Sequence, residues 1–184
     1  MRMFSSCRTK SARRLRPSRL LAGSFILAVF LAACSKDGPP LPCPTVVPVA
    51  DAAQLVRFKG QGRDLTDVLF EARIENYALT CEYDDGVIEG QMLLQVLAAR
   101  GPADRDQVAR LGYFVAIATR DQKIGAREEF ELAIPFEGNR TRVLAAEELT
   151  PRIPLKPGED GSNYLIYIGL SVTPEELQYN RENR

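Results

Sequence analysis

The chain of 184 residues contains no histidine and no tryptophan, and each absence removes a class of function. Without histidine there is no Ser-His-Asp or Cys-His nucleophile system, no proton shuttle near neutral pH and no His-based zinc site. Without tryptophan, a carbohydrate-binding face lacks the side chain best suited to stacking on sugar rings, and an Ig-type core lacks its usual tryptophan. Carboxylates and tyrosines remain as the candidates for any chemistry.

The chain also lacks an apolar run long enough to span a membrane. Its most apolar segment covers residues 20–33, which is shorter than the roughly 20 residues that a membrane-spanning helix needs. Seven basic residues and no acidic residue precede it in residues 1–19. A basic segment followed by a short apolar one is typical of a cleaved export signal. We therefore expect residues 1–33 to be a signal peptide that is removed.

The apolar segment ends in Leu31-Ala32-Ala33-Cys34. This ending resembles the lipobox of bacterial lipoproteins, which implies cleavage between Ala33 and Cys34 and acylation of the Cys34 thiol. Two or three acyl chains hold a protein stably on a membrane. Ser35 stands where an Asp favours retention in the inner membrane of Gram-negative bacteria. The resemblance thus implies the inner leaflet of the outer membrane, facing the periplasm, while the alternative is an ordinary secretory signal cleaved near Ala33.

The charge of the remaining chain argues against nucleic acid as a partner. Residues 1–33 hold seven of the 24 basic residues and none of the 24 acidic ones, so residues 34–184 carry 17 basic and 24 acidic residues, a net charge of −7. An acidic domain repels nucleic acid and gains no attraction to anionic lipid headgroups. We expect no nucleic-acid partner, and we expect the acyl chains alone to attach the protein to the membrane.

Two cysteines remain once Cys7 leaves with the signal and Cys34 is acylated. Cys43 and Cys81 lie in an oxidising compartment, where a lone pair of thiols favours a disulfide. A bridge across 38 residues stabilises a domain by on the order of 4 kcal/mol in the loop-entropy model. The alternative is two unpaired, buried thiols.

Five prolines between residues 35 and 48 favour an extended, stiff backbone. We therefore divide the mature chain into a lipidated Cys with a proline-rich tether at residues 34–44 and one domain at residues 45–184. About 150 residues is the usual size of a single domain with a proper core.

Apolar residues in the domain alternate with polar ones at a period of two, which is typical of strands with one buried face. The alternating segments are residues 68–74, 88–98, 124–136 and 164–172. Residues 111–119 are apolar on both faces and predict a central strand, and an Asp-Gly turn predicts a hairpin between 79–83 and 87–98. Weaker strands are predicted near 45–49, 53–58 and 151–155. The sequence predicts an all-β fold, an Ig-like antiparallel β-sandwich of about seven strands.

Two segments carry helix signals. Thr173, Pro174 and Glu176 form a capping box with proline at the first helical position, which predicts a short C-terminal helical turn. Residues 144–149 predict another single helical turn. In addition, Asp160 lies four residues before Tyr164, a spacing that resembles the tyrosine corner of Ig-type sandwiches. The alternative there is a plain loop followed by a buried tyrosine.

Acidic residues cluster at two predicted turns, where they could ligate calcium or act as a carboxylate pair. One set is Glu82, Asp84 and Asp85, and the other is Asp64 and Asp67. The spacing of a calcium loop is absent, and acids at turns are expected from local backbone hydrogen bonding. We therefore predict no catalytic residue, no metal site and no cofactor.

Residues 62–68, 152–155 and 173–177 resemble uncharacterised envelope lipoproteins of alphaproteobacteria, and this resemblance implies no activity. We expect a non-enzymatic protein-binding or scaffold module that contacts another envelope protein. The alternative is a domain that binds or hydrolyses peptidoglycan or polysaccharide through carboxylates.

The anchor generates the first testable prediction. Cys34→Ala is expected to abolish membrane association and to leave the precursor unprocessed, because an acidic domain cannot replace the acyl chains. Membrane fractionation and intact-mass measurement check this result. A variant that still sediments with membranes at wild-type mobility would contradict it.

Overall fold

The computed structural model describes residues 40–183, so the expected cleavage at Ala33 and lipidation of Cys34 lie outside the described residues. Most of the described chain is strand. The strands are β1 (Thr45–Pro48), β2 (Gln54–Phe58), β3 (Val68–Asp84), β4 (Val87–Arg100), β5 (Val108–Thr119), β6 (Ile124–Pro135), β7 (Arg142–Leu149), β8 (Arg152–Pro154) and β9 (Tyr164–Ser171). Helix α1 spans Pro174–Glu182, and 3-10 turns cover Ala50–Ala52, Leu65–Asp67 and Gly161–Asn163.

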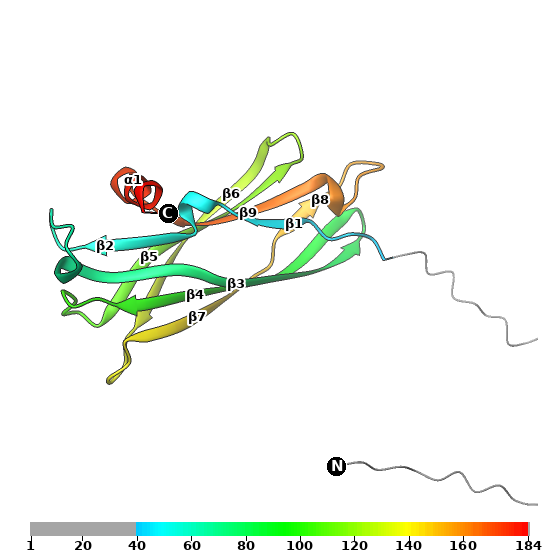
Figure 1. Cartoon of the computed structure of the whole chain (residues 1–184). Helices are drawn as coiled ribbons and strands as arrows, with labels where there is room; N and C mark the ends of the chain where they lie inside the picture. The colour runs from blue at the N-terminus through cyan, green and yellow to red at the C-terminus, as the bar shows by residue number, and fades with distance from the viewer. Residues whose placement is uncertain (1–39, 184) are drawn as a thin grey trace, which may run out of the picture. The chain divides into compact units, whose positions relative to one another are not determined.

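These strands form two sheets that pack face to face (Figure 1). The first sheet has the order β1-β9-β5-β6, and the second has the order β2-β3-β4-β7. Strand β8 also belongs to the second sheet and pairs with the first residues of β4. Strand β1 runs parallel to β9, and the other pairs are antiparallel. The predicted mostly-β, sandwich-like fold is confirmed, with more strands than the seven expected and one parallel pair among them.

The longest hairpin joins β3 and β4 through the predicted Asp-Gly turn. Asp85 and Gly86 both have positive φ angles, 48° and 80°, which is the geometry of a type I′ hairpin turn. The two strand segments predicted at 68–74 and 79–83 are parts of one strand, β3. A register shift between Ile74 and Asn76 bends β3 without ending it.

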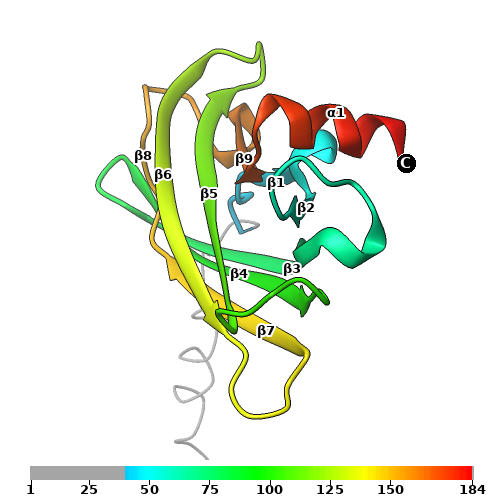
Figure 2. The same ribbon diagram turned by 90° about the vertical axis from the view of Figure 1, so that its left-hand side faces the viewer.

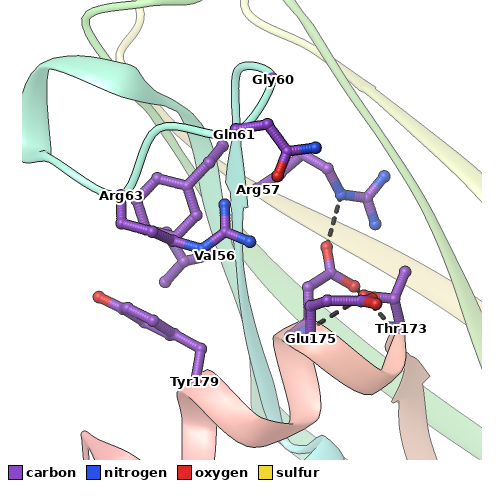
Figure 3. A pocket seen from close by; sticks show the side chains of 10 residues that line it. Val56, Arg57, Gly60, Gln61, Arg63, Thr173, Glu175 and Tyr179 are labelled. Carbon is purple, nitrogen blue, oxygen red and sulfur yellow. Dashed lines mark hydrogen bonds and ion pairs between the residues drawn. The ribbon is translucent and has the colours of Figure 1, made fainter.

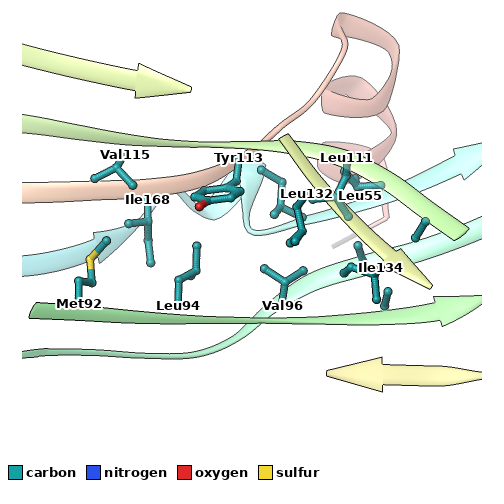
Figure 4. Close-up of a cluster of buried hydrophobic side chains, with 14 of the residues drawn as sticks. Leu55, Met92, Leu94, Val96, Leu111, Tyr113, Val115, Leu132, Ile134 and Ile168 are labelled. Carbon is teal, nitrogen blue, oxygen red and sulfur yellow. The ribbon is translucent and has the colours of Figure 1, made fainter. Parts of the chain in front are cut away.

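The core lies between the two sheets, where the inner faces of β4, β5 and β9 meet (Figure 4). Leu94 and Val96 of β4 are fully buried, and so are Ile168 and Leu170 of β9. Burying an aliphatic side chain of this size stabilises the fold by about 1.5–3 kcal/mol. The period-two pattern of these segments therefore predicted the buried face correctly.

Strand β5 is buried on both faces, as its continuous apolar sequence predicts. Tyr113 points into the main core, and its neighbours Phe114 and Ala116 pack on the other face against Ala52 of the first 3-10 turn. The Arg127 guanidinium lies 4.1 Å from the centre of the Phe114 ring and covers it from β6. A strand between two apolar layers needs no polar face.

Two predicted details are wrong, each because pairing overrides a local signal. Residues 144–149 form strand β7 rather than a helical turn, since β7 pairs with β4 and every second residue packs on the core. The alternation in residues 124–136 predicts Ile124 on the buried face of its strand, but Ile124 is 61% exposed. In the pairing of β5 with β6, Ile117 is opposite Ala126 and Ala118 is opposite Ile124. Gly125 is therefore the extra residue of a β-bulge, which moves the Ile124 side chain to the other side of the sheet.

Helix α1 begins where the capping box predicts. The Thr173 hydroxyl accepts the Glu176 backbone N–H, and the Glu176 carboxylate accepts the Thr173 backbone N–H. Near its end, the buried Asn180 side chain donates to the carbonyls of Asp51 and Gln54 and so holds the helix on the sandwich. Among the residues described, no helix is long and apolar enough to span a bilayer.

The core generates the second prediction. Leu94→Ala is expected to lower the free energy of unfolding by about 2–5 kcal/mol, because it leaves a cavity between the sheets. Leu144→Ala on β7 removes a side chain that is 49% exposed and is expected to cost about 0.5 kcal/mol or less. Urea unfolding of the two variants measures the difference, and equal losses would show that the core is wrongly placed.

Candidate functional site

The predicted disulfide between Cys43 and Cys81 is present, with the two Cα atoms 5.8 Å apart. It joins the residues that precede β1, in the first sheet, to β3 in the second. The Tyr83 hydroxyl donates to the Pro42 carbonyl at 2.6 Å and accepts the Gly161 backbone N–H at 2.7 Å. The end of the tether is thus fixed by one covalent bond and one bridging tyrosine.

The two residues of the predicted tyrosine corner have separate roles. The Tyr164 hydroxyl donates to the Glu159 carboxylate at 2.6 Å, with the Pro154 carbonyl 3.4 Å away. The Asp160 carboxylate instead accepts the Ser162 backbone N–H at 2.8 Å and caps the following 3-10 turn. The bond to Glu159 raises the pKa of Tyr164 to about 12. The acidic partner of Tyr164 therefore lies five residues before it, not four.

The candidate acidic clusters do not assemble. Glu82, Asp84 and Asp85 lie exposed along the tip of the β3–β4 hairpin, and Asp64 and Asp67 flank a 3-10 turn. In residues 40–183 no three acidic or cysteine side chains come together as a metal-binding group. Glu82 and Asp84 belong to the end of β3, Asp85 to the hairpin turn, and Asp67 to the 3-10 turn that Asp64 precedes.

A hollow of about 420 Å³ lies between α1, β2 and the loop that follows β2 (Figure 3). Arg57 and Glu176 form an ion pair of 2.7 Å across it, and Arg63 lies 5.2 Å from the centre of the Phe58 ring. The Phe58 ring also meets the Tyr179 ring edge to face at 5.3 Å. The charged groups and rings that line this hollow contact one another, and these contacts hold α1 on β2.

A second hollow, the seam groove, lies at the open side of the sandwich and has a volume of about 390 Å³. Strands β5 and β6 of one sheet form one wall, and the corner between β7 and β8 of the other sheet forms the opposite wall. Its lining is Val115, Ile117, Ala126, Arg127, Glu128, Phe130, Glu148, Leu149, Thr150, Pro151 and Arg152. Figure 2 shows β6 running past β8 on this side of the molecule.

The groove exists because the two sheets diverge toward the tips of their hairpins (Figure 1). The first six residues of β6 are exposed on both faces, whereas Leu132 and Ile134 near its end are buried. On the opposite wall, the Gly90 backbone N–H donates to the Pro151 carbonyl at 2.8 Å. A Cβ at Gly90 would lie only 2.8 Å from Pro151 Cγ, so this glycine permits the sharp corner.

The floor of the seam groove is apolar. Val115, Ile117 and Leu149 contribute aliphatic side chains, and the half-buried Phe130 ring closes one end. Phe130 stacks on Tyr113 with ring centres 5.0 Å apart. The Tyr113 hydroxyl donates to the Glu147 carboxylate at 3.2 Å, and burial together with that carboxylate raises the tyrosine pKa. The Phe130 end of the floor is therefore fixed by its contact with the buried Tyr113.

The rim of the groove carries uncompensated negative charge. Arg127 is paired with Glu129 at 2.9 Å, and Arg152 is paired with Glu89 at 2.6 Å. Glu128 on the β6 wall is exposed, and among residues 40–183 its carboxylate has no hydrogen bond or ion pair. Glu148 alternates with the inward residues of β7 and lies on the outer face of the second sheet. The groove thus offers apolar contacts on its floor and the carboxylate of Glu128 on its β6 wall.

Sequence reasoning did not find the groove. The alternation in residues 124–136 predicts which side chains face inward, but it does not predict that the first six residues of β6 stay exposed on both faces. The one available signal was the polar inward position of Glu128, which breaks the apolar face between Ala126 and Phe130.

No protein-family model matches the chain, and no curated protein matches it in sequence. Among solved structures it is similar to the variable (V) domain of the AgI/II polypeptide BspA of Streptococcus agalactiae. The identity is 10% over 67% of this chain and 75% of that one, with a TM-score of 0.17.

The bond between Tyr164 and Glu159 generates a prediction on pH. The unfolded chain ionises this tyrosine near the ordinary tyrosine pKa of 10.0, whereas the folded domain keeps the proton until about pH 12. The stability due to the bond is thus complete below pH 10 and lost as the pH rises toward 12. Tyr164→Phe should flatten this alkaline decrease, measured by urea unfolding from about pH 8 to about pH 12. Parallel curves for wild type and variant would contradict it.

Proposed function

We propose that the protein is a lipid-anchored envelope lipoprotein on the inner leaflet of the outer membrane, whose domain is a non-enzymatic module that binds another envelope protein. The observation that supports the proposal is the seam groove, an apolar floor beside a strand edge that is open along β6. The disulfide is consistent with a location outside the cytoplasm, where such bonds persist.

A protein partner suits the chemistry of the groove better than a sugar. Sugar hydroxyls need many hydrogen-bonding side chains, and the faces of sugar rings stack on flat aromatic surfaces. The floor is instead formed by Val115, Ile117 and Leu149 with one phenylalanine. Apolar pockets next to a free strand edge are typical of peptide recognition by strand addition. An Ig-like form of the sandwich belongs to the same proposal, because two packed sheets with exposed edges support many binding modules.

The position of the tether also supports a scaffold role. Thr150 and Arg152 line both the seam groove and a smaller hollow that reaches Cys81. Because Cys81 holds Cys43 through the disulfide, a partner in the groove would lie near the point where the tether joins the domain. The module would therefore hold its partner close to the membrane.

The proposal predicts a site-specific crosslink in cells. A photo-crosslinking amino acid at Ala126, inside the groove, is expected to give one discrete protein adduct on illumination. The matched control is the same amino acid at the exposed Ala133, which lies on the same strand but faces away from the groove.

The pattern of adducts separates the two functions considered. A discrete protein adduct from Ala126 alone supports the binding module. A heterogeneous adduct from Ala126 that collapses on digestion with a muramidase would instead favour the peptidoglycan-binding alternative. No adduct from Ala126, or equal adducts from both positions, would contradict the proposal.

A further inference from the structure

Strand β7 lies at the margin of the second sheet and pairs with β4 alone among the described strands (Figure 1). The Arg100 backbone N–H donates to the Thr141 carbonyl at 2.8 Å before β7, and the Gly90 backbone N–H donates to the Pro151 carbonyl at 2.8 Å after it. Both acceptors are odd-numbered residues in one continuous register, and backbone groups alternate in direction along a strand. The even-numbered residues therefore point their N–H and C=O groups away from β4 to an open edge: Arg142, Leu144, Ala146 and Glu148.

This open edge lacks the features that keep sheet edges apart, such as prolines, bulges, covering elements and charges of one sign. Strand β1 ends in Pro48, β8 ends in Pro154, and β2 is covered by α1. Strand β6 carries Glu128, Glu129 and Glu131 within four residues, so two copies of it would repel each other. Strand β7 contains no proline or glycine and pairs with β4 without a register shift. Among the described edges, β7 is best suited to pair with a second copy of itself.

The charges of β7 have opposite signs at its two ends. Arg142 begins the strand, Glu148 stands one residue before its end, and both are exposed. Within the described chain neither side chain takes part in an ion pair. Between them lie Ala146 and Leu144, which is 49% exposed. Because all four alternate with the inward residues of β7, they share the outer face of the second sheet.

Antiparallel pairing of two β7 strands matches these side chains in one register. Arg142 of each copy then lies opposite Glu148 of the other, and Leu144 lies opposite Ala146. Opposite charges meet at both ends of the joined edge, and apolar side chains meet between them. A shift by two residues removes both charge pairs, and parallel pairing would bring like charges together. The sequence of β7 therefore selects this register.

We propose that the protein forms a two-fold symmetric dimer, in which the β7 strands of two copies pair in this register and join their second sheets into one continuous sheet. The partner at this edge is thus a second copy of the chain. The inference goes beyond the proposed function, because it concerns the β7 edge and not the edge of β6. Pairing over residues 142–148 is a small interface, and attachment to one membrane would strengthen it by raising the local concentration.

The first test uses the full chain purified in detergent, with micelles in excess over protein. Analytical ultracentrifugation from about 1 to about 100 μM covers the dissociation constants expected of a small interface. The wild-type chain is expected to show a reversible equilibrium between monomer and dimer. A chain that stays monomeric over this whole range overturns the inference.

Charge reversals test the register. Arg142→Glu and Glu148→Arg each place like charges opposite one another at two sites of the dimer, so each is expected to raise the dissociation constant at least about tenfold. The double variant restores both pairs and is expected to return to within about threefold of wild type. The two residues are about 20 Å apart along one strand, so this rescue cannot arise within one chain. A double variant that dimerises no better than the single ones would overturn the proposal.

A proline on the open edge tests the strand pairing itself. The Ala146 N–H points away from β4, so Ala146→Pro removes no hydrogen bond of the fold but blocks one to the second copy. The variant is expected to keep its cooperative unfolding and to stay monomeric. If it folds and dimerises like the wild type, the interface lies elsewhere and the inference is wrong. If it does not fold, the charge reversals decide the question.

Cysteine crosslinking tests the same register in cells. The two Ala145 residues would lie opposite each other at about 4.5 Å between Cα atoms, within reach of a disulfide, so Ala145→Cys is expected to give a linked dimer. The matched control is Ala146→Cys, which is more exposed but lies diagonally from its counterpart at about 7–8 Å. Chance collisions would favour the more exposed position. A dimer from both variants, or none from Ala145→Cys, would contradict the proposed pairing.

Discussion

The fold depends on the burial of β4 against β5 and β9. The inward side chains of β4 from Met92 to Ala98 are almost completely removed from water, and they meet equally buried residues of the first sheet. Apolar burial of this kind is the main favourable contribution to folding, set against a similar loss of conformational entropy. The short strands β1, β2 and β8 and helix α1 attach to this pair of sheets and cover parts of its margin.

The same packing explains why one side of the sandwich stays open. Twisted sheets in face-to-face contact stay close only over part of their length, and their strands diverge beyond it. The first half of β6 is exposed on both faces, and the chain opposite it turns from β7 into β8 at Pro151. The groove is therefore a consequence of strand lengths and twist, and the sequence at Glu128 and Phe130 determines its chemistry.

Much of the sandwich follows from the sequence because each strand carries its own signal. The alternation around Leu94 and the continuous apolar run around Phe114 predict one-sided and two-sided burial correctly. Residues 144–149 were misread because their helix-favouring composition is local, whereas their pairing with β4 is not. The groove could not be predicted at all, since it depends on where two sheets, distant in sequence, lose contact.

The disulfide has a mechanical consequence. Tension on the chain before Cys43 would otherwise act on β1, which pairs with β9 over only four residues at a sheet edge. The bond to Cys81 diverts that load into β3, which is paired with β4 along almost its whole length. A pull therefore shears a long ladder of hydrogen bonds instead of peeling a short strand. Reduction of one bond would turn a strong attachment point into the weakest part of the domain.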